Sequence, residues 1–256
     1  MKTIAKSLFV LAFVLAFVLF TVTSLQAQDA KAIVKKAVEL QQGVSSSYGE
    51  MAMTIVRPDY TRTMTMKSWS KGDNNSLILV TSPVRDKGTA FLKRDKEMWN
   101  WQPTIERVIK MPPSMMSQSW MGSDFTNDDL VRQSSTVDDF SHKLLGTETI
   151  EGREAYKIEL IPNEDAVVVW GKMMMWIDTE AYIQLKVEFY DEDAYLVNTI
   201  YGKNIKKMGG KMVASIMEVV PAEEEGNKTV IEYKVLEFEK PIKESFFSVQ
   251  SMKRVR

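Results

Sequence analysis

The stretch AVVVWGKMMMWIDTEAYIQLKVEFYDEDAYLVNTIYGKNI, residues 166–205, decides the fold of this chain. It consists of short runs of β-branched, aromatic and methionine residues, separated by turn-forming residues. Runs of this kind are typical of β-strands. The stretch therefore predicts three or four strands, with YDEDAY (Tyr190–Tyr195) as a hairpin turn rather than a metal-binding loop. Such tight turns favour antiparallel neighbours, because parallel strands need long crossover connections.

The same pattern continues on both sides of this stretch. Downstream, KMVASIMEVVP (residues 211–221) and KTVIEYKVLEFEK (residues 228–240) are joined by an acidic turn. Upstream, GEMAMTIVR (residues 49–57) and YTRTMTMKSW (residues 60–69) place alternate methionines on one face. Further strands are expected within residues 76–83, 89–95, 97–103, 106–111 and 143–163. One large antiparallel sheet is the predicted fold, and sheets of this size curl or close.

A helix is predicted near the beginning of this β-rich region. In DAKAIVKKAVELQQGVSSSY (residues 29–48), the apolar residues Ala30, Ile33, Val34 and Ala37 recur at helical spacing. Gly43 and three serines follow and end the pattern. We expect this helix and a helical insert in the middle of the chain to fill the concave side of the sheet.

The N-terminal residues predict export from the cytoplasm. Lys2 and Lys6 precede an apolar run from Leu8 to Phe20, and small and polar residues follow it. This is the pattern of a secretory signal peptide, and its 13 apolar residues are fewer than a membrane-spanning helix needs. We predict a signal peptide over residues 1–27 and a single domain over residues 28–256. An uncleaved membrane anchor is the alternative.

Composition excludes several classes of function. Without residues 1–27 the net charge is about −3, which is not the footprint of a nucleic-acid-binding protein. The chain has no cysteine, so it has no disulfide, no thiol nucleophile and no lipid-anchoring cysteine. Its only histidine, His142, lacks a partner at a spacing typical of catalysis or metal binding. No nucleophile elbow or phosphate-binding loop is present. We predict a protein that is not an enzyme and has no catalytic residues, cofactor or metal.

Three aspartates in GSDFTNDDLV (residues 122–131) are the nearest approach to a reactive cluster. Asp124, Asp128 and Asp129 would fit a calcium site or an acid pair. The favoured interpretation is a helix start, because Thr126 or Asn127 can cap a helix whose first turn contains acids. An acid pair would be the basis of the least favoured hypothesis, a hydrolase.

Methionine and tryptophan are unusually abundant. After residues 1–27 are removed, 16 methionines and six tryptophans remain. Several of them fall in the broken stretch IKMPPSMMSQSWMGSDF, residues 109–125. Methionine packs adaptably and is common at apolar surfaces that accept varied partners. Two interpretations of this stretch stay open: it is plain core, or it is a flap that contacts a ligand. Pro112, Pro113 and Gly122 bracket a segment suited to move.

The block EMWNWQPTIERVIKMPPSMMSQSWMGSDFTNDDLV, residues 97–131, resembles the bacterial outer membrane lipoprotein-sorting proteins, which are related to the Lol periplasmic lipoprotein carriers. GREAYKIELIP, MWIDTEAYIQLKVEFYD and ESFFSVQSMKRV, at residues 152–162, 175–191 and 244–255, resemble the strand pattern of the same family. The resemblance covers nearly all of the chain after residue 27. It implies a mainly β fold with helices, an incomplete antiparallel β-barrel wrapped around helices.

The resemblance also implies a function in the periplasm. The expected role is to hold the acyl chains of a lipoprotein or lipid in an apolar cavity and to deliver them toward the outer membrane. The alternative is a sensing or adaptor module of the same fold that docks on an inner-membrane exporter of the RND type. Expected partners are the cargo, such an exporter and an outer-membrane acceptor. The residues expected to line the cavity and its lid are Met64, Met66, Trp99, Trp101, Met115, Met116, Trp120 and Met121.

Overall fold

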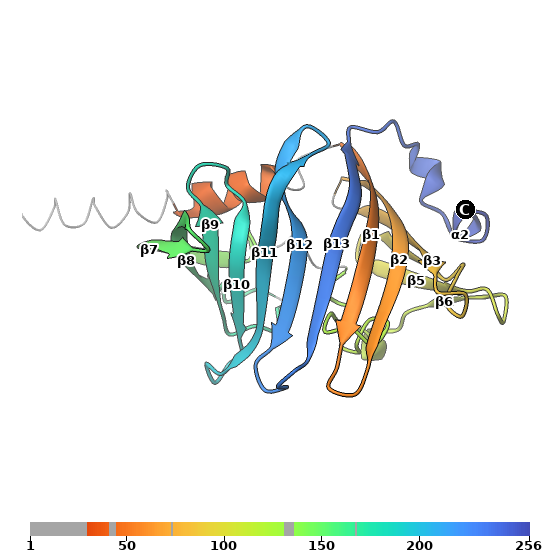
Figure 1. Ribbon diagram of the computed structural model, residues 1–256, viewed down its shortest axis with the longest axis horizontal. Helices are drawn as coiled ribbons and strands as arrows, with labels where there is room; N and C mark the ends of the chain where they lie inside the picture. Colours follow the sequence, from red (N-terminus) through yellow and green to blue (C-terminus); the bar gives the residue numbers. More distant parts are fainter. Residues whose placement is uncertain (1–29, 41–44, 73, 131–135, 167) are drawn as a thin grey trace, which may run out of the picture.

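The strands form two antiparallel meanders, which are joined because the first strand of the chain pairs with the last one. The computed structural model describes residues 30–40, 45–72, 74–130, 136–166 and 168–256. Within them, thirteen antiparallel strands form a sheet in the order β6-β5-β4-β3-β2-β1-β13-β12-β11-β10-β9-β8-β7 (Figure 1). The pairing of β1 with β13 joins the two meanders, and β6 and β7 form the two edges of an open sheet.

The strand bounds follow the alternation of apolar and polar residues. The strands are β1 (Ser46–Val56), β2 (Thr61–Lys71), β3 (Asn75–Ser82), β4 (Ala90–Arg94), β5 (Glu97–Gln102), β6 (Arg107–Lys110), β7 (Phe140–Ile150), β8 (Arg153–Pro162), β9 (Lys172–Asp178), β10 (Gln184–Tyr190), β11 (Leu196–Met208), β12 (Lys211–Pro221) and β13 (Lys228–Phe238). The prediction of a mainly β fold with one large antiparallel sheet is confirmed.

Helices contribute little to the described structure. The expected N-terminal helix is present over residues 30–40. The expected mid-chain insert contains only the 3₁₀ turn η1 (Pro113–Met115) and irregular turns through residue 130. Near the C-terminus lie η2 (Glu244–Phe246) and α2 (Val249–Met252). The expected sheet wrapped around helices therefore stays a prediction. The expected signal peptide lies outside the described residues, and in the described part no helix is long and apolar enough to cross a membrane.

One face of the sheet carries two large apolar clusters. Residues paired across antiparallel strands point to the same face, and Met53 of β1 pairs with both Met64 of β2 and Ile231 of β13. The row continues to the far side of the sheet through Ile200, Val187, Met175 and Ile158. We call this the inner face.

The two inner-face clusters differ in what covers them. The methionine cluster consists of Met51, Met53, Ile55, Met64, Met66, Val80, Phe91, Met98, Trp120, Phe125, Val219 and Ile231. The helix cluster consists of Ala30, Val34, Ala37, Phe140, Ile158, Leu160, Met173, Met175, Ile177 and Val187. Helix 30–40 thus packs against the strands near the β7 edge, and the irregular segment 111–130 packs against the strands near the β6 edge.

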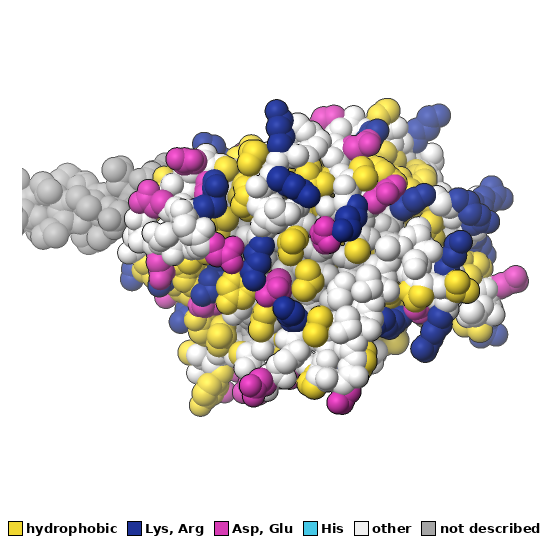
Figure 2. Space-filling view, viewed as in Figure 1, with side chains coloured by type: hydrophobic (Ala, Val, Ile, Leu, Met, Phe, Trp, Pro, Cys, Tyr) yellow, Lys and Arg dark blue, Asp and Glu magenta, His cyan; other side chains and the backbone are white. Residues whose placement is uncertain are grey.

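The outer face is covered at one end by the C-terminal residues. Phe247 directly follows η2, and Met252 is the last residue of α2. Both pack against Leu77 of β3 and Leu92 of β4. Elsewhere on this face, lysines lie over aromatic rings and pair with glutamates, as Lys186 does with Trp176 and Glu188. Figure 2 shows basic and acidic side chains interspersed among apolar ones across the molecule.

Candidate functional site

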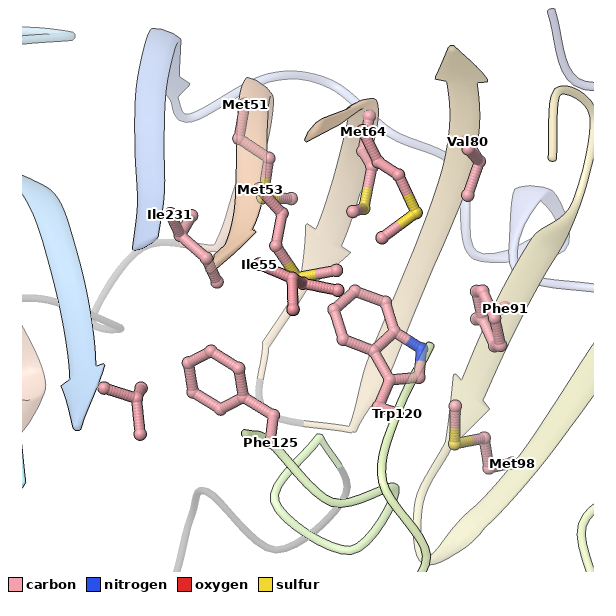
Figure 3. Packing of buried hydrophobic residues seen from close by; sticks show 12 residues of the cluster. Met51, Met53, Ile55, Met64, Val80, Phe91, Met98, Trp120, Phe125 and Ile231 are labelled. Carbon is pink, nitrogen blue, oxygen red and sulfur yellow. The ribbon is translucent and has the colours of Figure 1, made fainter. Parts of the chain in front are cut away.

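Segment 111–130 crosses the inner face and completes the methionine cluster. Trp120 is 2% exposed and Phe125 is 8% exposed, and both point into the cluster from the segment (Figure 3). The ring of Trp120 meets Phe91 of β4 edge-on, with 5.5 Å between the ring centroids. Four partly buried side chains of the segment pack against the same cluster: Met111, Met116, Met121 and Leu130. The segment is therefore a cover over an apolar surface that the sheet alone would expose.

The residues of the cover explain why it is irregular. Pro112 and Pro113 lack backbone N–H groups, so they cannot join a sheet ladder or continue a helix. Met121 and Gly122 have φ angles of 56° and 77°, a conformation that only glycine adopts without strain. These two residues reverse the chain between Trp120 and Phe125, whose backbones are linked by a hydrogen bond of 2.7 Å from the Trp120 N–H to the Phe125 carbonyl.

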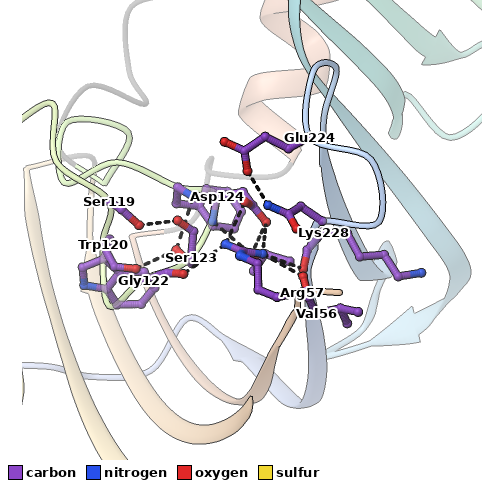
Figure 4. A network of polar contacts seen from close by, with 12 residues as sticks. Val56, Arg57, Ser119, Trp120, Gly122, Ser123, Asp124, Glu224 and Lys228 are labelled. Carbon is purple, nitrogen blue, oxygen red and sulfur yellow. Dashed lines mark hydrogen bonds and ion pairs between the residues drawn. The ribbon is translucent and has the colours of Figure 1, made fainter. Parts of the chain in front are cut away.

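A buried ion pair fastens this cover to the sheet. Arg57, directly after β1, donates from Nη2 to Asp124 Oδ1 at 2.9 Å and from Nη1 to Asp124 Oδ2 at 3.2 Å (Figure 4). The side chains are only 15% and 5% exposed. Arg57 also donates to the backbone carbonyls of Val56 and Gly122. Such bidentate, charge-assisted pairs are strong and directional, so Arg57 joins the tip of the cover to the end of β1. We call the Arg57–Asp124 pair the latch.

Thr229 of β13 supports the latch from the other side. Its hydroxyl donates to Asp124 Oδ2 at 2.6 Å and accepts from the Asp124 backbone N–H at 3.0 Å. Thr229 is fully buried. Asp124 is therefore held by both central strands of the sheet, β1 and β13, at the point where the two meanders meet.

The neighbouring aspartates have structural contacts. Asp129 Oδ2 accepts from the Thr126 backbone N–H at 2.7 Å, and Thr126 Oγ1 accepts from the Asp129 N–H at 3.1 Å. This reciprocal exchange is a capping box, as expected for Thr126. Residues 127–130 form turns, and residues 131–135, where a helix would continue, lie outside the described residues.

The structure brings together most of the predicted lining residues and separates two. Met64, Met66 and Trp120 belong to the methionine cluster, and Met116 and Met121 pack against it. Met115, in η1, is partly exposed. Whether any of these residues binds a ligand stays a prediction.

Trp99 and Trp101 lie on the other face of the sheet. They pack with Phe247 and Met252 on the outer face, whereas their neighbour on β5, Asn100, is paired with Phe91 and faces inward. The reason is the two-residue period of a strand, which sends adjacent side chains to opposite faces.

Sequence reasoning missed the latch. Arg57 and Asp124 are 67 residues apart, and each is an ordinary residue of a turn in its local sequence. The GSD turn did indicate a chain reversal at Gly122, but no local pattern marks Arg57 as its partner.

Two titratable groups on the inner face have their pKa shifted by burial. His142 of β7 is 8% exposed, and its Nε2 lies 2.9 Å from the Thr136 carbonyl. Burial lowers the pKa of His142, and Lys31 of helix 30–40 lowers it further. Tyr233 of β13 packs against the methionine cluster, and burial raises the pKa of its phenol. Both shifts favour the neutral form of the side chain, as an apolar inner face requires.

Comparison with known proteins supports this architecture. A family model described as "Uncharacterized protein" matches residues 72–254. A DUF1329 family protein from Desulfovibrio piger superposes with a TM-score of 0.80 at 23% identity, over 89% of this chain and 99% of that one. An outer membrane lipoprotein-sorting protein domain from Vibrio parahaemolyticus gives 0.77 at 25% identity, over 89% and 100%.

This chain belongs to the family whose model matches residues 72–254. Its structural neighbours include the lipoprotein-sorting protein domain and a LolA superfamily protein from Nitrosomonas europaea, which superposes with a TM-score of 0.71 at 23% identity over 87% of this chain and 98% of that one. No curated protein matches the sequence. The resemblance of residues 97–131 to the lipoprotein-sorting family is thus confirmed.

Proposed function

We propose that this protein is a periplasmic carrier that binds acyl chains of a lipoprotein or lipid on the inner face, beneath segment 111–130, and delivers them toward the outer membrane. The observation that carries the proposal is the contrast between the cover and what it covers. A broad methionine-rich surface is closed by an irregular segment that is itself rich in methionine and tryptophan. The side chains of this segment occupy the place that we assign to an acyl chain.

The chemistry of the cluster suits a flexible hydrocarbon. Methionine side chains are unbranched and adapt to irregular shapes, so they can repack around chains of different length. Burial of one methylene is worth about 0.8 kcal/mol. A chain of about a dozen methylenes would gain on the order of 10 kcal/mol before the ordering costs. Binding of this strength needs a cover that can move, because otherwise release would be slow.

The latch gives the cover a defined point of attachment. Opening breaks the contacts of Asp124 with Arg57 and Thr229. Cargo would then lie between the cover and the sheet, where it compensates for the apolar surface that opening exposes. The equilibrium shifts only as far as the cargo prefers the open form.

A disulfide that fixes the cover tests this proposal. The natural chain has no cysteine, so Asp124→Cys with Thr229→Cys introduces one pair, at positions whose side chains are in hydrogen-bond contact. The oxidised protein should fail to take up a fluorescent acyl probe, and the same protein after reduction should bind it. Equal uptake in the two forms would show that acyl chains bind elsewhere.

A second experiment asks about natural cargo. The protein purified from the cell envelope is extracted, and the extract is analysed by mass spectrometry for bound lipid or lipoprotein. Recovery of acylated cargo, and its transfer to acceptor membranes, supports the carrier. Absence of lipid together with no probe uptake contradicts it. Loading without transfer, with one stoichiometric membrane partner, favours the sensing or adaptor alternative.

A further inference from the structure

Two polar atoms at the methionine cluster have no hydrogen-bond partner among the described residues. They are the indole Nε1 of Trp120 and the side-chain Oδ1 of Asn100, and both are buried. A buried polar group without a partner costs about 1–3 kcal/mol, and such groups are rare in folded proteins. Two of them in one place need an explanation.

Both residues are neighbours of Phe91, a member of the methionine cluster. Asn100 of β5 lies opposite Phe91 of β4, so both side chains project from the inner face. The Trp120 ring meets Phe91 at an interplanar angle of 73°. In Figure 3 the indole nitrogen lies on the side of Trp120 that is nearest to Phe91. The cover thus contributes one unpaired group and the sheet contributes the other.

The two groups are complementary rather than alike. Indole Nε1–H only donates, and an amide oxygen only accepts. A ligand group that satisfies both must accept one hydrogen bond and donate another. An amide or a hydroxyl does this, whereas an ester accepts only and a plain hydrocarbon does neither. A carboxylate would bring an unpaired charge into an apolar cluster, which is costly.

We propose that Trp120 and Asn100 form a polar recognition point for the head of an acyl chain that carries a neutral donor–acceptor group, an amide or a hydroxyl. This inference rests on the proposed function, because the chain must enter between the cover and the sheet. The hydrocarbon then lies along the methionine cluster, and the head group bonds with Trp120 Nε1 and Asn100 Oδ1. The methionine cluster can accept many different acyl chains. Trp120 and Asn100 select among them by the chemical group at the head of the chain.

A contact between the indole N–H and the face of the Phe91 ring is the competing explanation. Contacts of this type are weak, and they would leave Asn100 Oδ1 without a partner. They also predict that the indole N–H gives no hydrogen bond to a ligand, so the effect of Trp120→Phe on ligand binding separates the two explanations.

The test uses competitors that differ only in the head group. N-methyldodecanamide, 1-dodecanol and methyl dodecanoate compete with a fluorescent acyl probe for the wild-type protein. We expect the amide, the alcohol or both to bind about 2- to 10-fold more tightly than the ester, the range of one neutral hydrogen bond. The amide and alcohol arms show which head group fits better.

Three variants assign this preference to the pair. Asn100→Leu should bring the ratio of the preferred competitor to the ester close to one, because only the amide and the alcohol can donate to Asn100 Oδ1. Trp120→Phe should weaken all three competitors and keep this ratio, because each of them can accept from Trp120 Nε1. The ratio cancels any general loss of apolar contact. Trp99→Phe is the matched control, because Trp99 lies on the same strand as Asn100 but packs on the outer face; its ratio should equal that of the wild type.

A second readout does not depend on ligand. Asn100→Leu removes a buried unpaired acceptor, so the empty variant should have a higher denaturation midpoint than the wild type, although it has lost selectivity. Probe binding with no head-group preference in the wild type would overturn this inference and leave the carrier intact. An unchanged preference in Asn100→Leu would also overturn it. No probe binding at all would instead overturn the proposed function.

Discussion

The two covers of the inner face solve the same problem in different ways. Helix 30–40 places Ala30, Val34 and Ala37 against the helix cluster, with exposed fractions of 0%, 0% and 4%. Small side chains let the helix axis approach the sheet, and the helix satisfies its own backbone hydrogen bonds. The cover over the methionine cluster uses large side chains on an irregular backbone, which must find its hydrogen bonds elsewhere.

Side chains supply many of those hydrogen bonds. Asn127 donates from Nδ2 to the carbonyls of Met115 and Gln118, at 3.0 and 3.1 Å. Ser123 donates to the Trp120 carbonyl at 2.7 Å. These bonds hold the cover together internally, and its polar attachment to the centre of the sheet is concentrated at Asp124. The comparison teaches that the helix is held by its own backbone bonds and small side chains, whereas the cover is a compact irregular unit joined to the sheet by large apolar side chains and by Asp124.

The largest expected effect comes from removing the latch. Asp124→Ala leaves Arg57 buried without its carboxylate, which should cost about 3–5 kcal/mol. Amide hydrogen exchange should accelerate over residues 111–130 far more than over helix 30–40. Asp59→Ala removes an exposed carboxylate two residues from Arg57 and should change neither region. Equal acceleration in both regions would mean that the cover and the helix unfold as one unit.

Cavities should be tolerated better beneath the cover than beneath the helix. Met53 and Ile177 are both 0% exposed in their respective clusters. Truncation of a buried Met or Ile to Ala costs about 2–5 kcal/mol, depending on how well the site collapses. We expect Met53→Ala near the lower end, because neighbouring methionines can move into the space, and Ile177→Ala near the upper end. Urea denaturation measures both, and the reverse order would contradict an adaptable methionine cluster.

Substitutions that add side-chain volume should also destabilise the protein more at helix 30–40 than in the cover. Ala37→Leu inserts methyl groups where the helix meets the sheet, and overpacking of this kind costs about 1–3 kcal/mol. Met121→Phe, which adds volume at a half-buried position of the cover, should cost less, at or below the lower end of this range of about 1–3 kcal/mol. Denaturation midpoints compare the two variants. A larger loss for Met121→Phe than for Ala37→Leu would mean that the cover is packed as tightly as the helix.

Acid should weaken the end of the sheet that carries the helix. The pKa of His142 is lowered in the folded state, chiefly by burial; Lys31 adds to the shift, while Asp138 and the bond with Thr136 oppose it. A lowered folded pKa means that the unfolded chain binds more protons between the two values. The stability present above the unfolded pKa, about 6.5, is therefore lost as pH falls through it toward the folded value.

His142→Gln provides the comparison for this effect. Wild-type protein should lose thermal stability relative to His142→Gln between pH 7 and pH 5, because Gln keeps a donor for the Thr136 carbonyl and does not titrate. The difference should be the smallest of the four effects. A parallel pH dependence of the two proteins would show that His142 does not contribute to it.

Local patterns predicted the elements well. The alternation in β1 and β2 predicted that Met51, Met53, Met64 and Met66 share a face, and they do. Helical spacing predicted that Ala30, Val34 and Ala37 share a buried stripe. These predictions succeed because the periods of strands and helices are properties of the backbone itself.

Predictions that depend on contacts between residues far apart in the sequence were less complete. The alternation of Trp99 and Trp101 showed that they share a face, but not which face. The C-terminal residues Phe247 and Met252 decide that, more than 140 positions further along the chain. In the same way, the buried place of Asn100 next to Phe91 becomes informative only with Trp120, which packs against the same Phe91 ring from a distant segment.

The sequence by itself determined an antiparallel, mainly β protein with a leading helix and a methionine-rich segment between two halves, because these features follow from local period and turn chemistry. Only the tertiary structure decided that β1 and β13 join the halves, that Arg57 and Thr229 hold Asp124 at that junction, and that the segment covers the inner face. The physical reason is that strand pairing, buried ion pairs and covered faces depend on residues far apart in the chain, and no local pattern encodes which distant partner will complete them.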